Sequence, residues 1–416
     1  MAVTESDEQD AKKLANLLLR SNTWMHRRVE RIMIEPTGES TRHISIDYTT
    51  PSEFRIRGSS DDTALIPLGL HRKGPLTGLS VWDSGGRPMP LLGTKDNGRL
   101  AVSMLLQLVN GSVNNPEVDL SSIEALIRKV VETRPGQDSG LRTRIEQELS
   151  GLGVDATSAA ILRKVILQFE KNFLMVVEMC EVVEGRRSIL KFEYRESRVH
   201  TELGHNAPKL QWEIRDFGMT ESVHVEFVAP SLLAVRSARL VRQAESEQDG
   251  TVIVGVDVPT PTVHLAAVPT NRFSPARLEL DLSPLRFGAI LGMLWGPAGM
   301  AAVVLTATIV HLLRLAEALP RAAVSPSIPA LMLAVGGLLL TWIARSPEDW
   351  TTSVILSRAR RSLILSALLA GGVAVYLSIP VPEPARTLGW VGLTMLGILN
   401  AIAAGREYSR SHIVVL

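Results

Sequence analysis

Long uncharged segments dominate the last third of the chain, whereas charged side chains are dense up to about Arg286. A helix needs about 20 consecutive apolar residues to cross the hydrocarbon core of a bilayer. The uncharged segments are 19 to 27 residues long and cover 287–313, 322–344, 362–382 and 387–405. The pattern predicts an all-α bundle of four transmembrane helices within residues 285–405. Buried helices of a soluble protein are the alternative, but these rarely run so long without a charge.

Arginines are unevenly distributed between the two ends of these segments. One side carries Arg272, Arg277, Arg286, Arg345, Arg358, Arg360, Arg361, Arg406 and Arg410. The other side carries only Arg314, Arg321 and Arg386. Because positively charged flanks favour the cytoplasmic side, we expect an integral protein of the cell (inner) membrane with both termini in the cytoplasm. The C-terminal tail at 406–416 is then cytoplasmic, and the acidic N-terminus shows no apolar signal-peptide segment.

The first uncharged segment carries three glycines at a spacing of four residues, Gly288, Gly292 and Gly296, followed by Pro297. This spacing places the glycines on one helix face, where they allow another helix to approach closely. Proline removes a helical hydrogen bond and kinks a helix. The pattern favours either tight packing within the bundle or a hinge in a pore-lining helix.

The region before the membrane segments alternates between helical and strand patterns. The N-terminal segment 1–36 is predicted to form an amphipathic helix over residues 6–34, because Leu14, Leu18, Met25, Val29 and Ile32 recur at helical spacing. We expect this helix to pack on its own domain, with a position on the membrane surface as the alternative. Residues 37–98 alternate apolar and polar side chains and are predicted to be β-rich, with a hairpin near Asp83.

A helical pattern returns over residues 99–185, which are predicted to form a helical insertion between two β-rich segments. The candidate helices are 99–109, 121–134, 139–150 and 157–183. The last of these contains the single cysteine, Cys180, which we expect to be a buried small hydrophobic side chain. One cysteine cannot form an internal disulfide.

Residues 186–284 are predicted to form an antiparallel, sandwich-like β segment, because seven short strand patterns follow one another there. Arg236, Arg239 and Arg242 lie in the weakest of these patterns and form a possible anion-facing surface, with a solvated edge strand as the alternative. The fold class expected for the whole chain is an α+β soluble region followed by an all-α four-helix transmembrane bundle.

Composition and motifs exclude several classes of function. The formal net charge is +1, with 45% hydrophobic and 21% charged residues, so there is no strong overall bias toward nucleic acid. The sequence contains no phosphate-binding glycine loop, metal-protease motif, paired-cysteine motif or hydrolase elbow. We therefore expect no enzyme activity, catalytic residue, cofactor or metal site.

Three functions fit this layout. The first is a membrane-anchored cytoplasmic module that binds or scaffolds an unknown ligand or protein. The second is a ligand-responsive effector whose transmembrane helices form a homo-oligomeric pore in the lipid bilayer, which the glycines and Pro297 favour. An enzyme of unrecognised type is the third, and no motif supports it.

Overall fold

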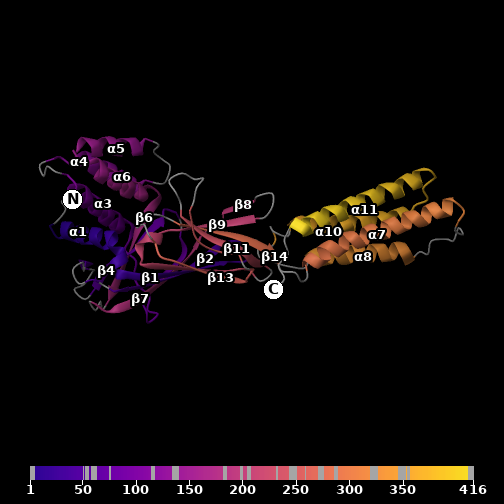
Figure 1. The fold of residues 1–416 in the computed structure, drawn as a ribbon, viewed down its shortest axis with the longest axis horizontal. Coiled ribbons are helices and arrows are strands. Elements are labelled where there is room, and N and C mark those ends of the chain that lie inside the picture. The colour runs from indigo at the N-terminus through magenta and orange to yellow at the C-terminus, as the bar shows by residue number, and fades with distance from the viewer. Residues whose placement is uncertain are drawn as a thin grey trace.

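The protein has three parts along its longest axis in the computed structural model: a group of helices, a central set of sheets, and a group of apolar helices (Figure 1). The structure describes residues 5–49, 51, 56–57, 63–74, 76–113, 118–133, 140–180, 185–196, 200–203, 208–230, 233–242, 251–257, 259–269, 276–284, 289–318, 327–344, 353 and 357–410.

The first group of helices comes from the N-terminus and from the predicted insertion. It comprises α1 (Glu5–Leu19), α2 (Ser21–Trp24), α3 (Thr94–Asn110), α4 (Ser121–Glu132), α5 (Leu141–Gly151) and α6 (Ala156–Lys171). Helix α1 packs against α3 and buries Leu14 and Leu17. The apolar side of α1 is therefore covered by the protein itself, as expected for a helix that packs on its own domain.

Three sheets make up the centre of the protein. The first has the order β13 (Thr262–Ala267), β10 (Ser222–Val228), β1 (Met25–Ile34), β2 (Ser40–Thr49), β7 (Arg187–Glu196), β5 (Thr77–Trp82). The second has the order β12 (Thr251–Val256), β11 (Leu233–Arg242), β14 (Ala276–Pro284), β9 (Pro208–Ile214), β8 (His200–Leu203). The third has the order β3 (Ile56–Arg57), β4 (Thr63–Arg72), β6 (Asn172–Cys180). The strand pairs described are antiparallel except β1 with β10, which is parallel.

Two hydrophobic cores lie on the same inner face of the first sheet. One core packs the helices and the third sheet against the β2, β7 and β5 side. The other packs the second sheet against β10 and β13, in the manner of a sandwich. Strand β1 reaches both cores, because Met25 belongs to the first and Ile32 to the second. Between these two residues the buried positions of β1 are Arg28 and Glu30, so charged groups separate the two cores.

The prediction of one helix through residue 34 is wrong, because α1 ends at Leu19 and residues Met25–Ile34 form β1. Alternate side chains of a strand share one face, and here the inward-facing ones are Arg28, Glu30 and Ile32. Charged residues at inward positions disguise the strand period in the sequence. Pairing with β2 on one side and β10 on the other overrides the helical spacing of the remaining apolar residues.

The predicted helix 157–183 is also wrong in its second half. Helix α6 ends at Lys171, and β6 follows at once from Asn172 to Cys180. The middle of β6 is buried on both faces, so its apolar residues form a continuous run instead of alternating. Cys180 lies at the end of β6 and is exposed, which corrects the expectation of a buried cysteine.

The apolar helices of the C-terminal part lie side by side (Figure 1). They are α7 (Ala289–Leu315), α8 (Ser327–Ala344), α10 (Ser357–Ser378) and α11 (Ala385–Arg410). Three contain apolar stretches long enough to cross a membrane, at Leu294–Leu315, Arg360–Ser378 and Ala385–Arg406. In α8 the apolar stretch Ser327–Thr341 is shorter. The structure thus confirms helices long and apolar enough to cross a membrane for three of the four predicted segments, within the described chain, and not for the fourth.

Polar contacts and small residues hold these helices together. Asn400 of α11 accepts a hydrogen bond from Ser362 Oγ at 2.8 Å, and its amide nitrogen donates to Ser366 Oγ of α10 at 3.0 Å. The Thr308 and Thr394 hydroxyls of α7 and α11 lie 2.7 Å apart. Gly336 of α8 lies against the backbone of α10, because a Cβ there would come within 3.2 Å of the Ala367 carbonyl oxygen.

Candidate functional site

A network of buried charges lies on the inner face of β1 and β2. Arg28 donates from Nε and Nη2 to Oε2 of Glu30 at 3.3 and 3.1 Å, and Arg42 Nη1 donates to Glu30 Oε1 at 2.7 Å. These three side chains are at most 2% exposed. The register explains the contact, because Glu30 is paired with Ile44 and Arg42 lies two residues from Ile44, diagonally across the strand pair.

Arg42 extends the network toward β7 and β9. Its Nη2 lies 2.7 Å from Oε2 of Glu196, and its Nη1 also donates to the backbone carbonyl of Glu213 at 2.9 Å. Tyr194 is the direct partner of Arg42 in the strand register, and the guanidinium lies 6.0 Å from its ring centroid. Glu196 in turn lies 3.4 Å from Nη1 of Arg215, the residue that follows β9.

Asp216 ends this network in a tight turn between β9 and the 3-10 helix Phe217–Met219. Its φ of 53° is left-handed, a conformation that aspartate tolerates better than most residues. Oδ1 accepts a hydrogen bond from the Leu70 amide at 3.1 Å, and Oδ2 lies 3.8 Å from Arg28 Nη1. Gly69 makes room for the carboxyl group, because a Cβ there would lie 2.5 Å from Oδ2. The φ of Gly69 is +125°, so the position favours glycine on both counts.

The surroundings shift the pKa values of the Asp216 and Glu30 carboxyl groups in opposite directions. Burial raises the pKa of Asp216 to about 6, and the nearby Arg28 guanidinium only partly opposes this effect. Burial alone would also raise the pKa of Glu30, but Arg42 and Arg28 outweigh it and hold that pKa below its ordinary value. Glu30 therefore stays ionised as the partner of the two arginines, whereas Asp216 titrates close to neutral pH.

His71 lies beside the network without joining it. Its ring is 1% exposed and is surrounded by the rings of Phe173, Phe192 and Tyr194, with centroids 5.6 to 6.2 Å away. Burial and the neighbouring arginines lower the pKa of His71 well below its ordinary value. Neither ring nitrogen has a hydrogen-bond partner in the described structure. His71 is therefore a neutral ring in this core.

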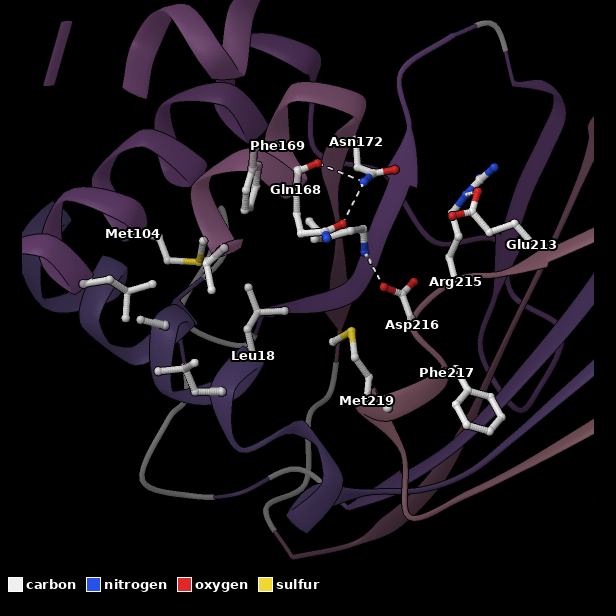
Figure 2. A pocket seen from close by; sticks show the side chains of 16 residues that line it. Leu18, Met104, Gln168, Phe169, Asn172, Glu213, Arg215, Asp216, Phe217 and Met219 are labelled. Carbon is white, nitrogen blue, oxygen red and sulfur yellow. Dashed lines mark hydrogen bonds and ion pairs between the residues drawn. The ribbon is translucent and has the colours of Figure 1, made fainter. Parts of the chain in front are cut away.

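An apolar cavity lies next to Asp216, and it is called the Asp216 cavity below (Figure 2). Its walls come from α1, α3, α6 and the segment Glu213–Met219, and apolar side chains such as Leu18, Met104 and Phe169 form most of its lining. The volume is about 80 Å³. In Figure 2 the Asp216 carboxyl group points toward the side of Gln168 and Asn172, where the dashed line marks its hydrogen bond with the Leu70 amide. Most of the lining of this small hollow is apolar, with a few polar groups.

Comparison of the sequence with protein-family models and with curated proteins gives no match. The site therefore has to be judged on its own chemistry. Among the described residues, no group of three or more histidine, cysteine, aspartate or glutamate side chains is arranged to hold a metal ion. The cavity offers a ligand an apolar surface, the Asp216 carboxyl group, the amides of Gln168 and Asn172, and the charged residues Glu213 and Arg215, which form an ion pair with each other.

The glycines, the proline and the arginines that the sequence analysis names as candidate residues do not line the Asp216 cavity. Gly288 is outside the described residues, and Gly292, Gly296 and Pro297 lie in α7. A Cβ on Gly296 would lie 2.7 Å from Cδ2 of Leu363 in α10, so this glycine is at a helix–helix contact. Its role in packing or as a hinge stays a prediction.

The three arginines of β11 do not form one row. Arg236 lies at an irregularity between Val235 and Ser237, and Arg236 and Arg239 are exposed while Arg242 is half-buried. Strand β11 is paired on both sides, with β12 and β14, so it is not an edge strand. Anion binding by these arginines stays a prediction.

Sequence reasoning misses the charge network because its residues are far apart in the chain. The one local signal is the pair Arg28 and Glu30 inside a strand-forming segment, and the helical spacing of the neighbouring apolar residues conceals it. Asp216 carries no local signal, since its environment is made by Leu70, Gly69 and Arg28 from distant strands.

Proposed function

We propose that the protein is a membrane-anchored binding protein whose soluble region takes up a small, mostly apolar molecule bearing an amine in the Asp216 cavity. The observation that carries this proposal is a buried carboxyl group with a pKa of about 6 at the wall of an apolar cavity. One water-sized group occupies about 10–15 Å³ of such a volume, so the cavity has room for roughly five to eight non-hydrogen atoms.

The charges around the cavity favour a cationic group. With Asp216 ionised, the network holds three positive and four negative side chains, which are Arg28, Arg42, Arg215, Glu30, Glu196, Glu213 and Asp216. The three arginines are each paired with a glutamate, so the ionised Asp216 leaves the network with one excess negative charge. An ammonium group donating to Asp216 would neutralise it.

The energetic cost of the network also supports a functional role. Buried ion pairs commonly contribute less stability than apolar side chains of the same volume, because the charges lose their hydration. A carboxyl group with a raised pKa in a cavity wall is a frequent property of functional sites. The network lies where two cores could otherwise have merged through apolar contacts.

The anchor and its orientation complete the proposal. Three apolar helices of sufficient length support attachment to a membrane. If α8 also crosses it, the arginine-rich flanks place both termini and the soluble region in the cytoplasm of the cell, at the inner membrane.

Binding of cyclohexylamine and cyclohexanol to the full-length protein in detergent tests this function by ligand-observed NMR. These two probes share one ring, have the same number of non-hydrogen atoms and differ only in the head group. We expect the amine to bind and the alcohol to bind more weakly. Asp216→Ala should weaken amine binding roughly 10- to 100-fold, because a charge-assisted hydrogen bond contributes about 1.5–3 kcal/mol.

Two variants of α6 provide the matched control. Val165 lines the cavity, whereas Ile161, one turn earlier, is 55% exposed and does not. Val165→Phe should abolish amine binding, and Ile161→Phe should leave it unchanged. Equal binding by wild type and Val165→Phe would show that the cavity is not the site.

A ligand-responsive membrane effector is the second candidate, and the connectivity favours it. Strand β9 ends immediately before the Arg215–Asp216 turn and is paired with β14, which ends at Pro284, close in sequence to α7. A displacement of the turn would therefore act on the strand that precedes the first apolar helix. Planar-bilayer conductance with and without cyclohexylamine tests this function, and a bilayer that stays silent in both cases contradicts it.

A further inference from the structure

A second and larger cavity, called the Lys73 cavity below, lies on the other side of Phe169. Phe169 lines both cavities and is 2% exposed, so its ring is part of the wall between them. The Lys73 cavity has a volume of about 960 Å³. It is bounded by the end of β4, by β5, by the first turns of α3, by the last turn of α4 and by the start of β6.

The lining of this cavity consists of apolar side chains, called the floor below, and of charged side chains, called the charged edge. The floor includes Leu76, Leu79, Leu91, Leu92, Phe173, Leu174 and Met175. The charged edge has four basic residues, Lys73, Lys95, Arg99 and Arg128, and two acidic ones, Asp96 and Glu132. An excess of positive charge above an apolar floor is complementary to a molecule that has an apolar body and an anionic head.

Two of the basic residues already have partners. Arg99 forms an ion pair with Asp96, and Arg128 with Glu124 at 2.8 Å. The other two, Lys73 and Lys95, form no ion pair shorter than 4 Å with the described residues. They are the groups with which an anion could pair.

Lys73 is the better placed of the two. Its Nζ donates to the carbonyl oxygens of Val130 and Thr133 at the end of α4, at 2.7 and 2.9 Å. An ammonium group has three hydrogens, so one remains for a ligand. Burial lowers the pKa of Lys73 to about 8, with Glu170 only partly opposing the effect. A bound anion would favour the charged form of Lys73 and so oppose the effect of burial on its pKa.

We propose that the Lys73 cavity binds an aliphatic carboxylate, the anion of a medium-chain fatty acid, with its head group on Lys73 and its chain along the leucine and phenylalanine floor. An acyl chain matches the floor because the residues of the floor are apolar and the cavity volume is about 960 Å³. A carboxylate oxygen can accept the one hydrogen of Lys73 Nζ that the Val130 and Thr133 carbonyls do not use. This site differs in charge and in location from the amine site proposed for the Asp216 cavity, and the two can be tested separately.

The chemical reactivity of Lys73 gives a direct readout in the full-length protein. At pH 8 about half of the amines with a pKa near 8 are neutral, against less than about 1% of ordinary lysines. Lys73 should therefore be methylated fastest among the nine lysines of the chain during reductive methylation, as followed by peptide mass spectrometry. Decanoate should slow this methylation at least fivefold, whereas decanol, which has the same chain and no charge, should not. The exposed Lys191 of β7 should react equally with and without decanoate.

A pair of surface variants separates binding from folding. Leu91 lies in the floor and is 36% exposed, and Ile189 of β7 is 38% exposed and outside the cavity. Leu91→Glu should raise the concentration of decanoate needed for half protection at least tenfold, and Ile189→Glu should leave it unchanged. Protection of Lys73 by decanol as strong as by decanoate, no protection by either, or protection unaffected by Leu91→Glu would each overturn the proposal.

Discussion

Replacement of Asp216 by asparagine should change how the stability of the protein depends on pH. The pKa of Asp216 is about 6 in the folded protein, against 3.8 for an unperturbed aspartate. A carboxyl group with a raised folded-state pKa binds its proton more tightly in the folded state than in the unfolded state. Its contribution to stability is therefore complete below about pH 3.8 and is lost as the pH rises through 6.

The size of the effect follows from the two pKa values. The difference is about 2.2 units, and one unit corresponds to about 1.36 kcal/mol, so the whole effect is about 3 kcal/mol, of which about 2.4 kcal/mol is lost between pH 4 and pH 7. Asparagine does not titrate and resembles the protonated carboxyl group in shape. The stability of wild type should therefore fall by about 2.4 kcal/mol relative to Asp216→Asn over this interval.

Urea denaturation of the full-length protein in a non-ionic detergent, followed by tryptophan fluorescence, measures this difference at a series of pH values. Folding lowers the pKa of other groups, such as Glu30 and Asp47. The stability that these groups contribute to the protein is lost as the pH falls, which is the opposite of the effect of Asp216. They are present in both proteins and cancel in the comparison. Parallel stability curves for wild type and Asp216→Asn from pH 4 to pH 7 would refute the reasoning.

Three further predictions concern the interior of the sheet-rich part and of the apolar helices. Glu30→Gln leaves two buried arginines without their shared partner and should lower the free energy of unfolding in urea by about 3–5 kcal/mol. The control Glu193→Gln changes a half-buried ion pair and should lower it by less than about 1 kcal/mol. Gly336→Leu should cost about 1–3 kcal/mol in detergent-induced unfolding, because α10 lies against that position, whereas its neighbour Gly337 faces open space and should tolerate leucine. Asn400→Leu removes the hydrogen bonds between α10 and α11 and should cost about 0.6–2 kcal/mol in the same assay.

The sequence predicts the elements whose pattern is local and regular. Three of the uncharged segments are long apolar helices in the structure, because about 20 successive residues without a charge are typical of a helix that crosses a bilayer. The strands of 186–284, the first three helices of the insertion and the first half of the fourth are also largely where the alternation and the helical spacing place them.

Elements with a disguised pattern cannot be predicted in the same way. Strand β1 escapes prediction because its inward face carries Arg28 and Glu30, and β6 because both of its faces are buried. The parallel pairing of β1 with β10 joins residues almost 200 positions apart, and nothing local in either strand specifies it. The candidate site depends on the same strand β1, so its geometry emerges only once that strand is paired.

The dissociation constant of cyclohexylamine between pH 4.5 and pH 7.5 tests the role of Asp216 as a ligand-binding carboxylate. The amine stays charged over this range, because alkylamines have a pKa near 10, while Asp216 passes from protonated to ionised at about pH 6. The account predicts that binding is roughly 30-fold weaker at pH 4.5 than at pH 7.5, with little change for cyclohexanol. A dissociation constant for the amine that is the same at both pH values would contradict it.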